Sequence, residues 1–196
     1  TTPDRYGTNT AEWDVTGPNG EAWIVKATAS GMPANTEVVY SASNRFEFRG
    51  VSGGNVIDGV SQTASFNMSF VVEDMSGTAI ELGACATACD MDSNSPGVQG
   101  DLADFVVFPG TIVSSGANVT VVGNEVMPPN SAGNHDPTAG DWDAATTDST
   151  NTDPAWCATS RTPISTSPVS FTAGAKTGTI GTSDNGRFFN FDMQYY

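Results

Sequence analysis

The chain has little positive charge and almost no pattern typical of a helix. Its 196 residues contain seven Lys and Arg against 22 Asp and Glu, a formal net charge of −15 at pH 7. Each contact with a nucleic-acid phosphate needs a Lys or Arg, and a strongly negative protein repels polyanions. We therefore exclude nucleic acid and anionic membrane surfaces as partners. Charged residues make up only 15% of the chain, so its solubility depends on Thr, Ser and Asn.

Long apolar runs and catalytic motifs are also missing. No stretch approaches the 18 apolar residues of a membrane helix, so we predict no membrane span. The single histidine, His135, lies in a polar stretch, and no Gly-x-Ser-x-Gly motif accompanies it. We therefore expect no enzyme. The chain starts at Thr1 without Met or a signal peptide, which predicts an exported mature product, extracellular or at the cell surface.

Alternating apolar and polar residues predict an all-β chain. In 64–73, four apolar side chains share one face, and Ser and Asn share the other, as in a half-buried strand. Short strands joined by Gly, Asn and Pro turns are typical of an antiparallel β-sandwich of jelly-roll type. We expect one domain over residues 1–196 with about nine to eleven strands. The expected strands are 21–29, 36–48, 56–60, 64–73, 78–82, 105–108, 111–114, 118–126, 169–173, 176–181 and 187–195.

Two segments lack this alternation. Residues 1–20 are polar and rich in turn residues, which predicts an extended N-terminal segment. Residues 128–168 contain only Trp142, Trp156 and Ile164 as large apolar side chains, which predicts a long polar loop. Loops of this length inside a domain are functional or disordered. The two Trp and Cys157 indicate that this one is held in place.

Three cysteines predict one disulfide in an oxidising compartment. Cys85 and Cys89 are separated by three residues, one more than in redox or zinc CxxC motifs. Either of them bonds Cys157, or the two bond each other. A bridge to Cys157 closes a loop of about 70 residues and contributes about 4 kcal/mol, twice what the short ring would contribute. The remaining thiol is buried or bonds a neighbouring subunit.

An acidic stretch following Cys89 has the spacing of a calcium-binding loop. Asp90, Asp92, Asn94 and Asp101 place oxygen side chains at loop positions 1, 3, 5 and 12. In this spacing the stretch resembles the EF-hand calcium loop, which implies a Ca²⁺ bound by these four side chains. It departs from that loop at position 6, where Ser95 replaces Gly, and it has Asp in place of Glu at position 12. The alternative is a solvated turn.

Tryptophan and tyrosine side chains suggest a binding surface. Trp142 and Trp156 lie in the polar loop, where exposed indole rings reduce solubility unless a partner covers them. They fix the loop to the domain, enter a neighbouring subunit or bind sugar. A stacking platform for sugars would add four further aromatic residues, namely Trp13, Trp23, Tyr195 and Tyr196.

Two functional hypotheses follow from these features. The first is a secreted structural subunit that binds copies of itself in a filament, pilus-like fibre, tube or surface layer, through exchange of a terminal strand between subunits. Strand 187–195 is a donor candidate, because Phe189, Phe191, Met193 and Tyr195 share one face. The alternative is a calcium-stabilised carbohydrate-binding or adhesin module, with the loop around Trp142 and Trp156 contacting glycans.

Overall fold

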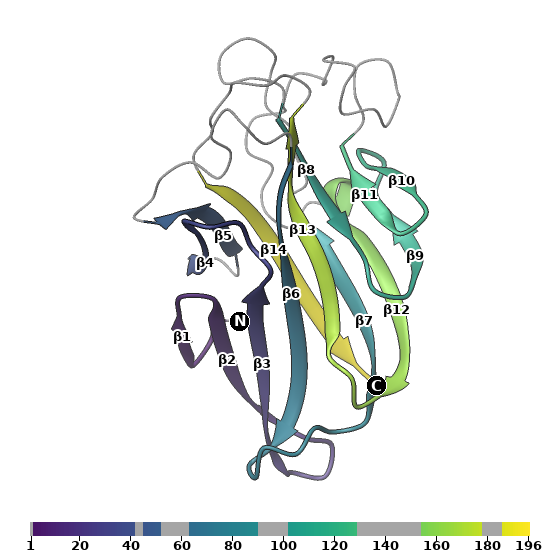
Figure 1. Cartoon of the computed structure of the whole chain (residues 1–196). Coiled ribbons are helices and arrows are strands. Elements are labelled where there is room, and N and C mark those ends of the chain that lie inside the picture. The colour runs from purple at the N-terminus through teal and green to yellow at the C-terminus, as the bar shows by residue number, and fades with distance from the viewer. Residues whose placement is uncertain (1, 42–44, 52–62, 90–101, 129–153, 178–185) are drawn as a thin grey trace.

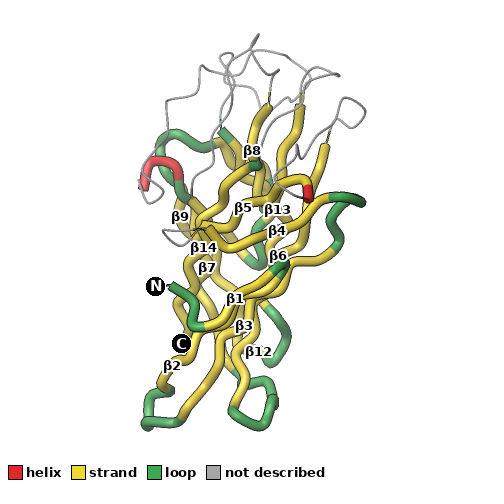
Figure 2. The backbone as a smooth tube through the Cα atoms, turned by 90° about the vertical axis from the view of Figure 1, so that its left-hand side faces the viewer, coloured by secondary structure: helices red, strands yellow, loops and turns green. Residues whose placement is uncertain are grey.

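Two antiparallel sheets packed face to face make up the fold, as the computed structural model in Figure 1 shows. The structure describes residues 2–41, 45–51, 63–89, 102–128, 154–177 and 186–196. Within these residues helix is limited to short segments such as η2 (Pro154–Trp156), drawn in red in Figure 2. The predicted all-β antiparallel sandwich is confirmed. The described part of the chain contains no helix long and apolar enough to cross a membrane.

The sheets contain eight and six strands. The order in the eight-stranded sheet is β1-β2-β3-β6-β13-β8-β11-β10. These strands are β1 (Arg5–Gly7), β2 (Thr10–Thr16), β3 (Ala22–Ser30), β6 (Thr63–Asp74), β13 (Val169–Thr177), β8 (Leu102–Val107), β11 (Glu125–Met127) and β10 (Thr120–Val122). The order in the six-stranded sheet is β4-β5-β14-β7-β12-β9. Its strands are β4 (Thr36–Ser41), β5 (Arg45–Gly50), β14 (Arg187–Tyr195), β7 (Leu82–Cys89), β12 (Ala158–Ser165) and β9 (Thr111–Ser115).

Phenylalanine rings fill the space between the sheets. The ring centroid of Phe66 in β6 lies 5.0 Å from that of Phe48 and 5.6 Å from that of Phe189. Phe171 of β13 and Phe191 of β14 approach to 4.7 Å. None of these side chains is more than 7% exposed, and burying each one contributes about 1.5–3 kcal/mol. Phe189 and Phe191, expected as assembly or ligand contacts, are therefore core residues.

Strand β14 lies inside the six-stranded sheet. Residues 187–190 pair with β5, and residues 190–195 pair with β7. The bounds of this strand agree with the predicted range, and the alternation places Phe189, Phe191, Met193 and Tyr195 toward the other sheet, as expected. Because β14 already belongs to its own sheet, the structure gives no support to its donation. Self-assembly by strand exchange stays a prediction.

The N-terminal segment forms a hairpin, not an extended arm. Strands β1 and β2 pair with each other, and β2 pairs along its length with β3. The turn contains Asn9 at φ 63°, a left-handed conformation that Asn tolerates better than most residues. Asn9 also bonds Val38 of β4 twice, through its backbone N–H at 2.7 Å and its side-chain oxygen at 2.8 Å. This turn therefore joins an edge of one sheet to an edge of the other.

Strands of small side chains account for the main errors in the predicted elements. Strand β7 has Ala84, Ala86 and Ala88 fully buried on its inner face, and alanine gives little strand signal. Strand β12 lies within the range predicted as loop, because its inward residues, Ala158, Ser160 and Thr162, are small or polar. The ranges 169–173 and 176–181 are not separate strands, since the single strand β13 covers Val169–Thr177. Range 56–60 lies outside the described residues.

An ion pair crosses the core between the sheets. Arg187 of β14 donates from Nε to Asp104 Oδ1 at 2.6 Å and from Nη2 to Oδ2 at 2.9 Å. The side chains are 7% and 1% exposed. A planar guanidinium matches both carboxylate oxygens, so the pair fixes the direction as well as the distance between β14 and β8.

We expect Gly83→Ala to destabilise the protein by about 1–3 kcal/mol, because the added Cβ overlaps the ring of Tyr196. The Tyr196 backbone bonds Gly83 in both directions, at 2.9 and 3.0 Å. Its hydroxyl donates to the Thr162 carbonyl at 2.7 Å. Urea denaturation measures the change. The double variant with Tyr196→Ala should lose less than the sum of the two single losses, whereas strictly additive losses would contradict the overlap.

Candidate functional site

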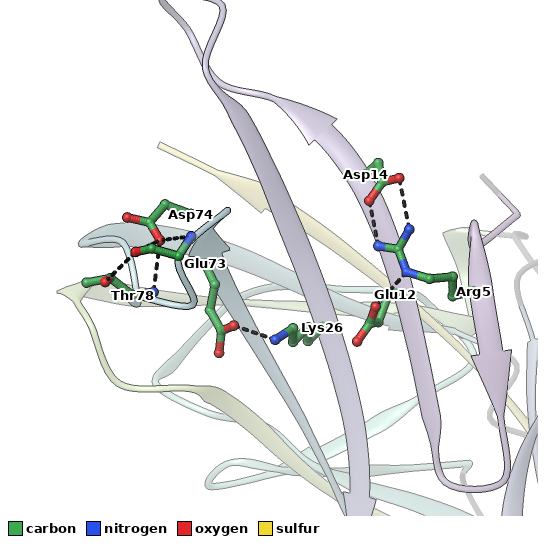
Figure 3. A network of polar contacts seen from close by, with 8 residues as sticks. Arg5, Glu12, Asp14, Lys26, Glu73, Asp74 and Thr78 are labelled. Carbon is green, nitrogen blue, oxygen red and sulfur yellow. Dashed lines mark hydrogen bonds and ion pairs between the residues drawn. The ribbon is translucent and has the colours of Figure 1, made fainter.

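Charged side chains on the outer face of the eight-stranded sheet form ion pairs with one another. Arg5 contacts Glu12 at 2.7 Å and Asp14 at 2.5 Å, and Lys26 contacts Glu73 at 2.5 Å (Figure 3). The hydrogen bond from Arg5 lowers the pKa of Asp14, and the bond to Glu73 raises the pKa of Lys26. These cross-strand pairs therefore have structural roles in the sheet.

Another acid in Figure 3 fixes a turn. Asp74 accepts hydrogen bonds from the Ser76 hydroxyl at 2.6 Å and from the backbone N–H groups of Ser76 and Thr78 at 2.8 and 2.9 Å. The Ser76 hydroxyl bond is the main cause of its lowered pKa. The described residues contain no group of three His, Cys, Asp or Glu side chains able to hold a metal ion.

The outer face of the six-stranded sheet carries a different set of side chains. Asp192 of β14 lies opposite Thr87 of β7, Thr87 lies opposite Thr159 of β12, and Thr159 lies opposite Ser114 of β9. Directly paired residues point to the same face of a sheet, so these four form a line across four strands, which we call the polar row. With about 4.8 Å between strands, the polar row is about 14 Å long.

A groove of about 580 Å³ lies over the polar row. All four residues of the row line it, together with Asn190 and the short segment around Pro154. Hydroxyl groups both donate and accept hydrogen bonds, and a carboxylate accepts only. The Thr87 and Thr159 hydroxyls lie 2.8 Å apart, which leaves them further bonding capacity. The groove therefore offers mixed donors and acceptors on a rigid sheet.

The disulfide forms one end of this groove. Of the three pairings left open, the structure has Cys89–Cys157, with Cys85 as a free thiol. Both bonded cysteines line the groove. Segment η2 is also attached to the turn after β9, since Gly116 N–H donates to the Cys157 carbonyl at 2.8 Å and Asn118 N–H to the Ala155 carbonyl at 2.9 Å. The wall of the groove is thus held by a covalent bond and two hydrogen bonds.

A second polar row continues the surface beyond the groove. Gln194, Cys85, Arg161 and Thr111 lie opposite one another on β14, β7, β12 and β9. The guanidinium of Arg161 lies 4.7 Å from the ring centroid of Tyr196, and its Nε donates to the Tyr196 hydroxyl at 3.1 Å. That hydrogen bond raises the pKa of Arg161. The face thus has an acid in one row and a fixed base in the next.

The structure separates the residues that the sequence grouped as contacts. Trp156 is half-buried in η2, beside the groove wall. Met193 and Tyr195 are half-buried at the other face of β14. Trp142 and all four predicted calcium ligands, Asp90, Asp92, Asn94 and Asp101, lie outside the described residues, so those roles stay predictions.

Sequence reasoning did not select the polar row. Thr and Ser occur throughout the chain, so Thr87, Thr159 and Ser114 carry no individual signal. Asp192 does carry a signal, because it is the acid among the outward positions of the strand 187–195. The line becomes visible only when strands distant in sequence are placed in register.

Comparison with solved structures identifies the fold. The adhesin domain of PrgB from Enterococcus faecalis bound to DNA matches with a TM-score of 0.50 and 15% identity, over 96% of this chain and 68% of that chain. The chain shares the fold of that domain. A second structure of the PrgB adhesin domain gives a TM-score of 0.50 and 15% identity over 98% of this chain and 64% of that one.

The glucan binding protein C of Streptococcus mutans also aligns, with a TM-score of 0.48 and 14% identity over 96% of this chain and 62% of that chain. No protein-family model matches the chain, and no curated protein matches it in sequence. At 15% identity the two PrgB structures establish the fold alone. The chain spans about two thirds of each of the three matched chains.

Proposed function

We propose that the protein is an extracellular adhesin-type module that binds carbohydrate in the groove over the polar row. The observation that supports this best is the alignment of Asp192, Thr87, Thr159 and Ser114 across four strands beneath a groove of about 580 Å³. A volume of this size is typical of small-ligand sites. The shared fold with an adhesin domain is consistent with the proposal.

The chemistry of the groove fits the hydroxyl groups of a sugar. A sugar hydroxyl donates to the Asp192 carboxylate and exchanges hydrogen bonds with the Thr and Ser hydroxyls. Pro154, which is exposed and also lines the groove, offers an apolar contact for the C–H face of a ring. We propose binding without catalysis, because Asp192 is the single acid among the described residues that line the groove, and none of these residues is a Lys, Arg or His.

The disulfide supports a location outside the cell. Disulfides persist in oxidising compartments such as the extracellular space and are rare in the cytosol. The Cys89–Cys157 bond also holds the groove wall, so the proposed site depends on such a compartment. Calcium at 90–101 remains part of the proposal as a loop stabiliser.

The charge of the chain favours a neutral glycan over DNA. The PrgB domain is described as bound to DNA, but this chain has seven basic residues and a net charge of −15. Binding to DNA requires several Lys or Arg contacts to phosphates. We propose that this protein uses a similar architecture with a different ligand class.

We expect Asp192→Ala to weaken glycan binding by about ten- to a hundredfold, since a hydrogen bond to a charged group contributes about 1.5–3 kcal/mol. A glycan array of neutral oligosaccharides identifies the ligand, and calorimetry measures the affinity. Thr87→Val should weaken binding less, because one neutral bond is lost.

Two variants serve as controls for charge and shape. Glu81→Ala removes an exposed acid distant from the groove, and Thr28→Val removes an exposed hydroxyl from the other sheet. Both should bind like the parent protein. If Asp192→Ala binds equally well, or if a 20-base-pair duplex DNA binds at 0.15 M salt while glycans do not, the proposal is wrong.

A further inference from the structure

Half of strand β14 has one unpaired edge. The β4–β5 hairpin closes at the Ser41–Arg45 pair, so Asn190 is the last residue of β14 that pairs with β5. Among the residues that the structure describes, Phe191–Tyr195 pairs only with β7. Five residues of a regular strand therefore present backbone donors and acceptors at an edge, which is the site at which another strand adds.

An apolar slot lies beside this edge, between the two sheets. Two adjoining cavities of about 140 and about 560 Å³ share Val15, Val25, Met193 and Tyr195 in their walls. Trp13 lines the first, and Trp23 lines the second. We call these six residues the edge slot. In Figure 1, β4 and β5 end above the lower halves of β2 and β3, whose inner faces supply the tryptophans.

The edge slot contains a hydrogen-bond donor that the described residues do not satisfy. The Tyr195 hydroxyl is buried, and no described atom bonds it. Burial raises the pKa of this group, so it stays protonated and able to donate. Buried polar groups in proteins are almost always bonded. A backbone carbonyl of a segment lying in the slot would accept this bond once the Tyr195 side chain turned toward it.

We propose that an extended segment of another polypeptide adds to β14 at Phe191–Tyr195 and places alternate apolar side chains in the edge slot. A polypeptide strand supplies donors and acceptors at the same repeat as β14, about 3.4 Å per residue. Its side chains also alternate between two faces. One face would contact Trp13 and Trp23, and the other would contact solvent.

Negative charge at this edge determines which side chains the partner should carry on its solvent-facing side. Asp192 and Gln194 point to the outer face of the sheet at the free edge. The chain as a whole has a net charge of −15. A second copy would bring another Asp192 and another excess of negative charge to the same contact. The fitting partner is therefore a different polypeptide, with Lys or Arg on its outward face.

A synthetic ten-residue peptide that alternates Val with Thr, with two Thr replaced by Lys, tests the proposal with the whole chain. Calorimetry measures its affinity, and amide hydrogen exchange measures protection at Phe191–Tyr195. We expect binding, with exchange at alternate residues of this range slowed by at least about tenfold. The variant Val15→Glu, which places a carboxylate in the edge slot, should weaken binding by at least about tenfold.

Controls separate strand addition from apolar binding in the slot. Val113→Glu changes an exposed valine of β9 and should bind like the parent protein. Two versions of the peptide, N-methylated at alternate sets of residues, keep every side chain. One set should lose binding by at least about tenfold, because its N–H groups face β14. Thr87→Val weakens glycan binding at a residue that lines the groove and neither cavity of the edge slot, so failure of the glycan proposal leaves this test intact.

Three results would overturn the inference. The first is that the peptide does not bind at millimolar concentration. The second is that both N-methylated peptides bind equally well. The third is that analytical ultracentrifugation shows a dimer of this protein, which Val15→Glu dissociates. The last would show that a second copy occupies the edge.

Discussion

Asp104→Ala is expected to lower the free energy of unfolding by about 3–5 kcal/mol, a fall in melting temperature of roughly 10 °C or more. The carboxylate accepts two hydrogen bonds from Arg187, and both side chains are almost fully buried. Its removal leaves a guanidinium charge in the core without this acceptor, and a buried charge that loses its partner is strongly destabilising. Guanidinium chloride denaturation monitored by tryptophan fluorescence measures the loss.

The double variant Asp104→Leu with Arg187→Met separates the charge from the packing. An apolar pair of similar volume often replaces a buried ion pair with little loss or with a gain. We therefore expect the double variant to be more stable than Asp104→Ala. If it is the less stable of the two, the pair contributes through its geometry, and the explanation by the lost charge pairing is wrong.

Cys89→Ser is expected to lower the free energy of unfolding by about 4 kcal/mol, and the melting temperature by about 10 °C. The two cysteines are 68 residues apart in sequence, and the disulfide restricts the unfolded chain over that whole loop. Cys157→Ser should have the same effect, because either change removes the same bond. Calorimetry on each variant measures the shift.

Cys85→Ser is the matched control, since Cys85 is a free thiol on the same face of the same strand, four residues before Cys89. We expect a change within about 0.5 kcal/mol for it. An equally large loss for Cys85→Ser would mean that the pairing is not unique. Reduction of the parent protein should reproduce the Cys89→Ser result and leave that variant unchanged.

Strands with large alternating side chains could be predicted from sequence, whereas strands of small residues could not. Phe66, Met68 and Phe70 identify β6 because apolar size alternates strongly with polar neighbours. The inward residues of β7 are alanines, and those of β12 include Ser160 and Thr162. Burial of those strands depends on neighbours that come from distant parts of the chain, which a local pattern does not report.

The candidate site was less predictable than the fold. The sequence limited the disulfide to three pairings, and only the placement of β7 beside β12 distinguishes them. The last strand was correctly located, but two of its aromatic residues, Phe189 and Phe191, are core. The free edge of β14 depends on where the β4–β5 hairpin closes, and strand order is not a local property of sequence.

The disulfide also has a mechanical consequence. When a chain is pulled at residues on either side of a covalent ring, the tension passes through the S–S bond and bypasses the residues inside the ring. The loop closed by Cys89 and Cys157 spans 68 residues, equivalent to about 230 Å of extended chain at ~3.4 Å per residue. Strands β8 to β11 and segment η2 lie within it. Under load this length is not released, so the wall of the groove stays attached to β7 even if the sheets begin to separate.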